Sequence, residues 1–157
     1  MAALPQDVVF DEQLAYQNVV SRRAKFHYSE LATHMQTFVS DVLARGGTVK
    51  VPCFYSLNNV PMDEMTDIEF FLPIVQDTFD PGENMRFHSY FEVSPTVHGT
   101  VTGDFDTQTE YVYALLLASL EQRGWEVNSP FFHVFPADGS AYVSVYLGYR
   151  DPTQEDD

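Results

Sequence analysis

The side chains of this sequence that are suited to binding chemistry are acids and aromatic rings that alternate with aliphatic residues along extended segments. Side chains at positions i and i+2 of a strand share one side. In residues 66–74, 85–93 and 141–149 one side is mainly aliphatic or Phe, and the other carries the polar and Tyr side chains. The candidate ligand-binding residues lie on these other sides: Glu69, Phe71, His88, Tyr90, Glu92, Tyr142 and Tyr146.

Such a set of rings with a few acids is typical of a binding surface or pocket. Aromatic faces attract organic cations, and a carboxylate among them adds charge complementarity. Glu69 is the strongest candidate for this charge recognition. The alternative interpretation is that Glu69 is an ordinary solvent-exposed residue of an edge strand, because Glu is rarely buried. Each tyrosine alone is equally compatible with half-buried packing, so the hypothesis depends on the set.

Motifs for cofactor, metal or covalent chemistry do not occur in the sequence. The five histidines show no compact metal-binding spacing, and Cys53, the only cysteine, lies in an apolar run that favours a core position. There is no Gly-rich phosphate loop and no nucleophile elbow. We expect no cofactor and no metal. A hydrolase in which Glu69 acts with Tyr90 or Tyr146 is a minority alternative, because acid–base catalysis needs a second group in reach.

The net charge of the chain limits the kinds of partner that it is expected to bind. The 157 residues contain 23 Asp and Glu against 8 Lys and Arg, a net charge of −15. Nucleic-acid binders need clustered positive charge, and anionic membrane surfaces repel acidic proteins, so neither partner is expected. Residues 1–10 do not form a signal peptide, and no run approaches the length of a membrane span. We expect a cytoplasmic protein whose partner is a hydrophobic or cationic small molecule, or a basic protein.

The sequence contains a repeat. Residues 39–54 can be laid on residues 117–132 so that Arg-Gly, Val, Pro and Phe coincide without a gap. Residues 68–72 then fall on residues 143–147. This repetition predicts one domain over residues 1–157, with repeat one at about 8–76, repeat two at about 85–150 and an acidic tail at 151–157.

Each repeat is predicted to contain a strand, a helix and two further strands. In the first, these are a strand over 16–26, a helix from Ser29 to Gly46, and strands over 49–56 and 66–74. In the second, they are a strand over 85–103, a helix from the Thr107–Glu110 capping box to Gly124, and a hairpin over 127–135 and 141–149. The fold class is α+β, an antiparallel sheet with two helices on one face and a cleft on the other.

Two groups of residues carry a family resemblance. Glu92-Val93-Ser94-Pro95, Gly103-Asp104-Phe105 and Gly124 with the following hairpin resemble the GyrI-like small-molecule-binding domain, also called the bacterial transcription activator effector-binding domain. Residues 66–74 resemble the acid-bearing strand of that family. Haem-binding SOUL proteins are related in fold. The resemblance implies two β-α-β-β repeats that face each other across a ligand cleft.

The sequence departs from the family at one position. The resemblance implies a pocket glutamate in the second repeat, and this chain has Ser144 there, at the position that matches Glu69. The likeness extends to stand-alone, uncharacterised Gram-positive members, some associated with type VII secretion loci. Besides small-molecule binding, it leaves open an acidic adaptor or inhibitor that binds a basic protein, as some stand-alone relatives inhibit gyrase, and a small-molecule hydrolase.

Overall fold

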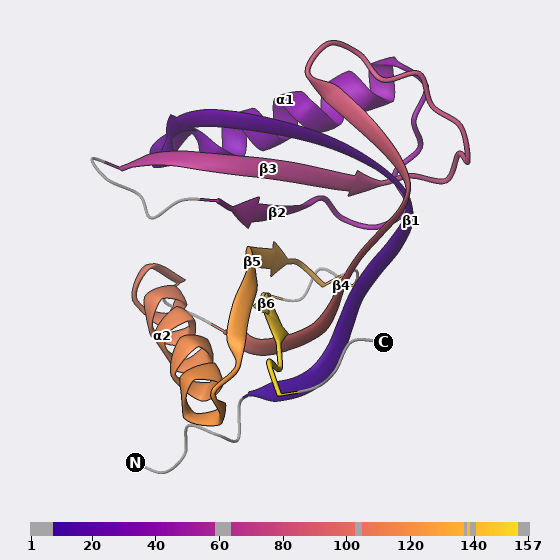
Figure 1. The fold of residues 1–157 in the computed structure, drawn as a ribbon. Coiled ribbons are helices and arrows are strands. Elements are labelled where there is room, and N and C mark those ends of the chain that lie inside the picture. The colour runs from indigo at the N-terminus through magenta and orange to yellow at the C-terminus, as the bar shows by residue number, and fades with distance from the viewer. Residues whose placement is uncertain (1–7, 59–63, 103–104, 137, 139–140, 154–157) are drawn as a thin grey trace. The chain divides into compact units, whose positions relative to one another are not determined.

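The computed structural model describes residues 8–58, 64–102, 105–136, 138 and 141–153. The chain forms two compact units, each with one long helix and antiparallel strands (Figure 1). The N-terminal unit is Ala15–Glu92, and the C-terminal unit combines Val93–Asp157 with Met1–Leu14. The predicted fold class is thereby confirmed, since the chain runs twice through the order strand, helix, strand, strand.

The N-terminal unit is organised around a central strand. Its elements are β1 (Val9–His27, from Ala15 onward), the short helix η2 (Tyr28–Glu30), α1 (Leu31–Ala44), β2 (Phe54–Leu57) and β3 (Met65–Pro73). Strand β3 pairs antiparallel with both β1 and β2, so that Phe71 stands opposite Ser21 on one side and Phe54 on the other. The alternate residues of β3 meet α1: the Phe70 ring lies 5.9 Å from Phe38 of the helix.

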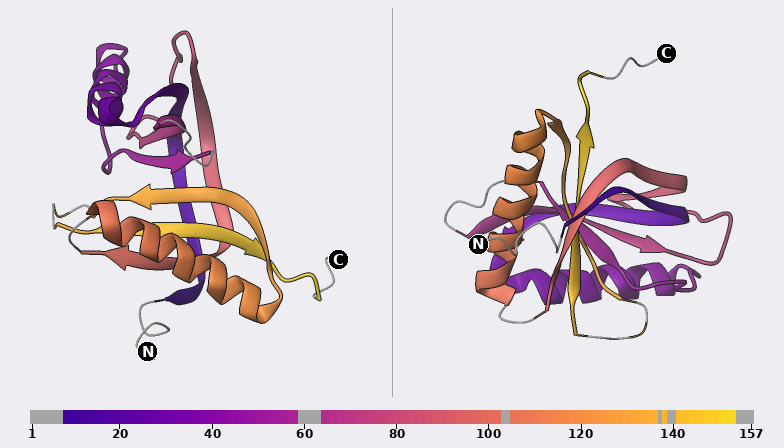
Figure 2. Two further views of the ribbon diagram at one scale, coloured as in Figure 1. Left: turned by 90° about the vertical axis from the view of Figure 1, so that its left-hand side faces the viewer. Right: turned by 90° about the horizontal axis from the view of Figure 1, so that it is seen from below.

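The C-terminal unit repeats this arrangement. It contains β4 (Met85–Val101, from Val93 onward), α2 (Phe105–Arg123), β5 (Glu126–Val134) and β6 (Val143–Arg150), and β6 pairs antiparallel with both β4 and β5. Figure 2 shows α2 lying along these strands. Its buried stripe packs on the aliphatic side of β4 and β6, and the core members from the three elements are Val97, Val101, Val112, Leu116, Leu120, Val145 and Leu147.

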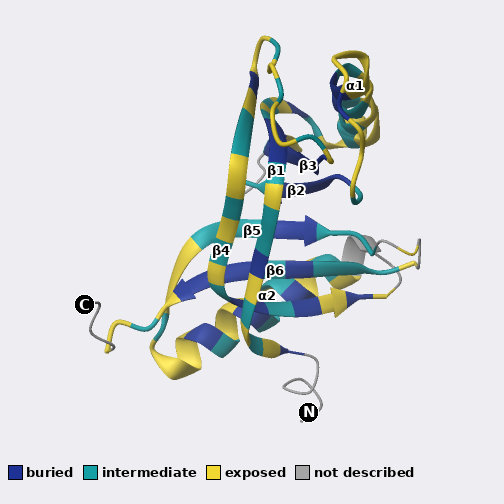
Figure 3. Ribbon diagram, turned by 90° about the vertical axis from the view of Figure 1, so that its right-hand side faces the viewer, coloured by how far each residue is buried: buried dark blue, intermediate teal, exposed yellow. Residues whose placement is uncertain are grey.

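Burial follows the predicted alternation. The helix-facing residues Ile68, Phe70 and Leu72 are each 1% exposed, and buried positions form stripes on both long helices (Figure 3). Burying an aliphatic or Phe side chain of this size contributes about 1.5–3 kcal/mol, which explains why the pattern is strict on this side.

The two helices end with the same backbone geometry. Gly46 and Gly124, 78 positions apart, both have positive φ, at 97° and 72°. The residue after each glycine donates its N–H to a carbonyl five residues back, Gly47 to Val42 at 3.0 Å and Trp125 to Leu120 at 3.0 Å. This is the hydrogen bond of a Schellman cap, in which the left-handed residue is usually Gly. The repeated Arg-Gly of the sequence therefore has a structural cause.

Strand register supports the same correspondence. Phe54 pairs with Phe71 in the first unit, and Phe132 pairs with Tyr146 in the second. Both pairs join positions that the sequence alignment made equivalent. The boundaries proposed for the two repeats stay a prediction.

Several predicted element bounds were wrong. Strand β1 begins at Val9 rather than 16, and β2 begins at Phe54 rather than 49, because Pro52 has no N–H for a ladder. Val49 makes only an isolated bridge to Ile74. Ser29 does not cap α1; it lies in η2 and donates its N–H to the His27 ring at 3.2 Å. Helix α2 begins at Phe105, two residues before Thr107, whose side chain lies outside the described residues.

The part of the chain that the structure describes contains no helix whose length and apolar character would suit a membrane crossing. It also holds no group of three or more His, Cys, Asp or Glu side chains placed to bind a metal ion.

Candidate functional site

The C-terminal unit has a face turned away from α2, which we call the C-terminal helix-free face. Strand pairing sets His98 of β4 and Phe132 of β5 on either side of Tyr146 of β6. Because Val97, Val145 and Leu147 pack toward α2, their neighbours in sequence point the other way. This face is formed by Thr96, His98, Phe132, Ser144 and Tyr146.

The centre of the face is a ring pair. His98 and Tyr146 stack with centroids 4.6 Å apart and planes 28° from parallel. Burial lowers the pKa of His98, and the Glu12 carboxylate opposes this shift. Burial raises the pKa of the Tyr146 hydroxyl, and the charges of Glu12 and then Tyr142 add to it. The stack therefore favours a neutral imidazole beside a protonated phenol, with a carboxylate close enough to act on both.

Two polar atoms of this face are buried without a hydrogen-bond partner. They are Oγ1 of Thr96, a residue 0% exposed, and Nδ1 of His98. A buried polar group left unpaired costs about 1–3 kcal/mol. Native proteins satisfy nearly all such groups, so each exception needs an explanation. A ligand that pairs with these atoms would recover the lost free energy.

Sequence reasoning missed Glu12, Thr96 and His98 as site residues. Glu12 lies before residue 16, where the first strand was predicted to begin, but it belongs to β1. Alternation along residues 9–15 is the signal that could have found it. His98 and Thr96 were overlooked because a single His or Thr in a strand carries no motif.

The N-terminal unit has the equivalent face, and it is filled by aromatic rings. Phe71 stacks on Phe54 at 5.0 Å and meets Phe91 at 4.8 Å. Tyr16 stacks on the other side of the group, 4.9 Å from Phe54. Phe71, a predicted site residue, is 4% exposed and is a packed member of this cluster.

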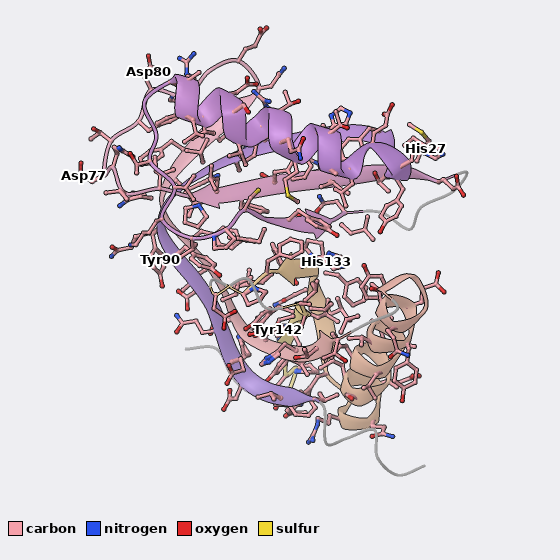
Figure 4. All side chains as sticks on the ribbon, turned by 180° about the vertical axis from the view of Figure 1, so that it is seen from behind. His27, Asp77, Asp80, Tyr90, His133 and Tyr142 are labelled. Atoms are coloured by element: carbon pink, nitrogen blue, oxygen red, sulfur yellow. The ribbon has the colours of Figure 1, made fainter. Side chains whose placement is uncertain are left out.

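The predicted site residues of β4 divide between two environments. His88 is hydrogen-bonded through Nε2 to Ser21 Oγ at 3.0 Å. Tyr90 is 53% exposed, and its hydroxyl donates to Glu92 Oε1 at 3.0 Å (Figure 4). The contact with Phe71 is made by Phe91, whose side chain points to the opposite side of the strand from Tyr90. Ligand binding by Tyr90 stays a prediction.

Glu69 lies half-buried on β3, and its cross-strand neighbour is Arg23. Two guanidinium nitrogens of Arg23 donate to the Asp67 carboxylate at 2.8 Å each. The Asp67 hydrogen bond is the main cause that raises the pKa of Arg23, and Glu69 adds a smaller effect. Glu69 therefore already faces a positive charge, which weakens its case as the group that recognises a cationic ligand.

The second repeat holds the remaining predicted residues, Tyr142 and Tyr146. Both are half-buried, and Glu12 and Tyr142 add to the effect of burial in raising the pKa of Tyr146, so the three residues lie in one neighbourhood. Of the predicted set, these two tyrosines therefore lie with the unpaired polar atoms.

Fold and faces together define an α+β domain of two β-α-β-β repeats. The chain belongs to the family described as Domain of unknown function (DUF5085), whose model matches residues 15–148. No curated protein matches the sequence.

Solved structures show the same fold. The crystal structure of the EcmrR C-terminal domain is 16% identical, with a TM-score of 0.74 over 92% of this chain and 97% of that one. EcmrR in a cryo-EM complex with DNA is 15% identical with a TM-score of 0.73, and the match covers 92% of this chain and 57% of that one. SAV2435 bound to tetraphenylphosphonium is 9% identical, with a TM-score of 0.48 over 92% of this chain and 93% of that one. The EcmrR C-terminal domain thus shares the fold of this chain.

Proposed function

We propose that this protein binds a hydrophobic, cationic small molecule on the C-terminal helix-free face, as a domain of the GyrI-like kind. The observation that carries the proposal is the pair of buried, unpartnered atoms, Thr96 Oγ1 and His98 Nδ1, beside the ring of Tyr146. A ring face with a few converging polar groups is the usual composition of a small-molecule site.

Charge supports a cationic ligand. Glu12 acts electrostatically on both His98 and Tyr146, and the rings present faces that attract cations. His98, with a lowered pKa, adds no positive charge at neutral pH. Glu12 takes the role that the sequence had suggested for Glu69, and it compensates for Ser144 at the position where the family resemblance implies a glutamate.

Thermal denaturation with two ions of the same shape tests the proposal. Tetraphenylphosphonium, the ligand named for SAV2435, is compared with the anion tetraphenylborate. A ligand at about 100 times its Kd stabilises a protein by about 2.7 kcal/mol. For a chain of this length, that raises the Tm by roughly 5–10 °C. We expect this rise with the cation only.

Matched variants locate the effect. Glu12→Gln and Glu83→Gln each remove one negative charge, but Glu83 is exposed in the other unit. Losing a nearby carboxylate costs about 1 kcal/mol, so Glu12→Gln should weaken binding about 5-fold and Glu83→Gln should not. The same measurement on Glu69→Gln compares the two candidate acids. Equal shifts with both ions, or no cation-dependent shift in any variant, would contradict the proposal.

A further inference from the structure

A second site lies in the C-terminal unit, at the end of its helix-packed core. A cavity of about 450 Å³ opens there. Its wall combines residues near the two ends of the described chain with residues of β4, of β5 and just before β5. They are Phe10, Asp11, Ser94, Pro95, Trp125, Asn128, Tyr149, Arg150 and Asp151. None of these residues belongs to the C-terminal helix-free face.

Three aromatic rings form one corner of the cavity. Trp125 and Tyr149 stack with centroids 4.8 Å apart and planes within 5° of parallel. Phe10 stands edge-on to both, 5.9 Å from Trp125 and 6.4 Å from Tyr149. Phe10 is therefore perpendicular to the stacked pair, and these three residues line one corner of the cavity.

The rings already attract a cation of the chain itself. The Arg123 guanidinium carbon lies 4.1 Å from the Phe10 centroid and 5.3 Å from that of Trp125. Arg123 approaches from the end of α2, and the cavity wall is made by other residues. Arg123 therefore already lies over the Phe10 and Trp125 rings and makes a cation–π contact with each.

Two carboxylates complete the cavity. Asp11, which has a left-handed backbone with φ of 63°, donates its N–H to the Tyr149 hydroxyl at 3.3 Å. Asp151 Oδ1 accepts from the N–H and the hydroxyl of Thr153, at 2.9 and 2.6 Å. These bonds, with a smaller contribution from Trp125, lower the pKa of Asp151. Asp151 is therefore a fixed, ionised group at the rim.

The positive charge in the wall is already paired. Arg150 Nη2 lies 3.3 Å from Glu126 Oε1. Burial raises the pKa of the Tyr149 hydroxyl, and the charges of Asp11 and Asp151 add to this shift, while the Asp11 N–H and the Arg123 charge oppose it. Both carboxylates therefore lie near that hydroxyl. The cavity therefore presents two carboxylates and three rings to a guest, and the Arg123 guanidinium lies against two of those rings.

We propose that this cavity binds a compact organic cation of the quaternary ammonium class. A methylated ammonium has no N–H to satisfy, so ring faces and carboxylates serve it better than they serve a group that needs directed hydrogen bonds. This site goes beyond the ligand site proposed above and shares no residue with it.

The only tryptophan of the chain is in the cavity wall, so its fluorescence reports on this site. The probe is choline, and its control is the uncharged analogue 3,3-dimethylbutan-1-ol, in which carbon replaces the nitrogen. We expect a saturable change in Trp125 emission with choline and none with the alcohol.

Asp151→Asn removes the charge at the rim but keeps an oxygen for Thr153. Asp77→Asn removes one exposed charge from the other unit and controls for net charge. We expect Asp151→Asn to weaken choline binding about 5-fold and Asp77→Asn to leave it unchanged. Thr96→Val alters the ligand site on the C-terminal helix-free face and should also leave choline binding unchanged. The two proposals can therefore fail separately. The proposal would be overturned by any of three results: an equal response to the alcohol, no saturation by ~10 mM choline, or equal weakening of choline binding by both Asp variants.

Discussion

His133 makes the stability of this protein depend on pH. It is 4% exposed beneath α2, and its Nε2 lies 2.6 Å from the Tyr113 hydroxyl (Figure 4). Burial lowers its pKa from 6.5 to about 4. The unfolded chain therefore takes up the proton at a higher pH than the folded chain. The stabilising effect of the neutral ring is complete above pH 6.5 and is lost as pH falls toward 4.

The magnitude follows from these two pKa values. Linkage between protonation and folding predicts a loss of about 2 kcal/mol in the free energy of unfolding between about pH 7 and about pH 5. His98, whose pKa burial also lowers, adds a change of the same sign. The quantity to compare is therefore the difference between the wild type and His133→Gln, which does not titrate at this position.

Urea denaturation followed by Trp125 fluorescence measures both proteins at the two pH values. We expect the fall in stability to be about 2 kcal/mol smaller in His133→Gln. Tyr113→Phe is the control: it removes the hydrogen bond but not the burial. It should cost about 1 kcal/mol at either pH and retain the wild-type pH dependence. If wild type and His133→Gln lose the same stability on acidification, the assignment of the shift to this buried ring is refuted.

Three further predictions concern single side chains. Thr96→Val should raise the Tm in the absence of ligand, because it removes a buried hydroxyl that has no partner; a lower Tm would mean that the hydroxyl is paired. Phe71→Ala should lower the free energy of unfolding by about 3–5 kcal/mol, because Phe71 is buried, and Tyr90→Ala should lower it by less than about 1 kcal/mol, because Tyr90 is exposed. Urea denaturation measures both values. Equal losses would show that the aromatic cluster is not a packed core. Burial raises the pKa of the Cys53 thiol to about 12. Cys53 should therefore resist alkylation by iodoacetamide in the folded protein and react with it in urea. Fast alkylation of the native protein would disprove its burial.

Elements and their order could be read from the sequence because they depend on local rules. A stripe of apolar residues at helical spacing buries one side of a helix, and Gly46 and Gly124 end the helices by taking the left-handed conformation. The alternation in β3 and β6 correctly separated the helix-packed residues from the others. The internal repeat extended this to register, since equivalent positions such as Phe71 and Tyr146 occupy equivalent rungs.

Site composition depended on contacts between residues far apart in the chain. Glu69 was favoured from its strand alone, but its partner across the ladder is Arg23, and no local rule contains that pairing. Glu12 and His98 lie 86 positions apart in the sequence, and only folding sets the carboxylate near the ring.

By itself the sequence determined the fold class, the two β-α-β-β repeats and the apolar sides of the strands, because periodicity, helix capping and the burial of apolar surface act within short segments. Only the tertiary structure decided which polar atoms are buried without partners, which acids stand beside rings, and that Phe10 meets Trp125 and Tyr149 at a cavity. Those properties arise from the sum of neighbours around each atom. Most of those neighbours come from distant parts of the chain.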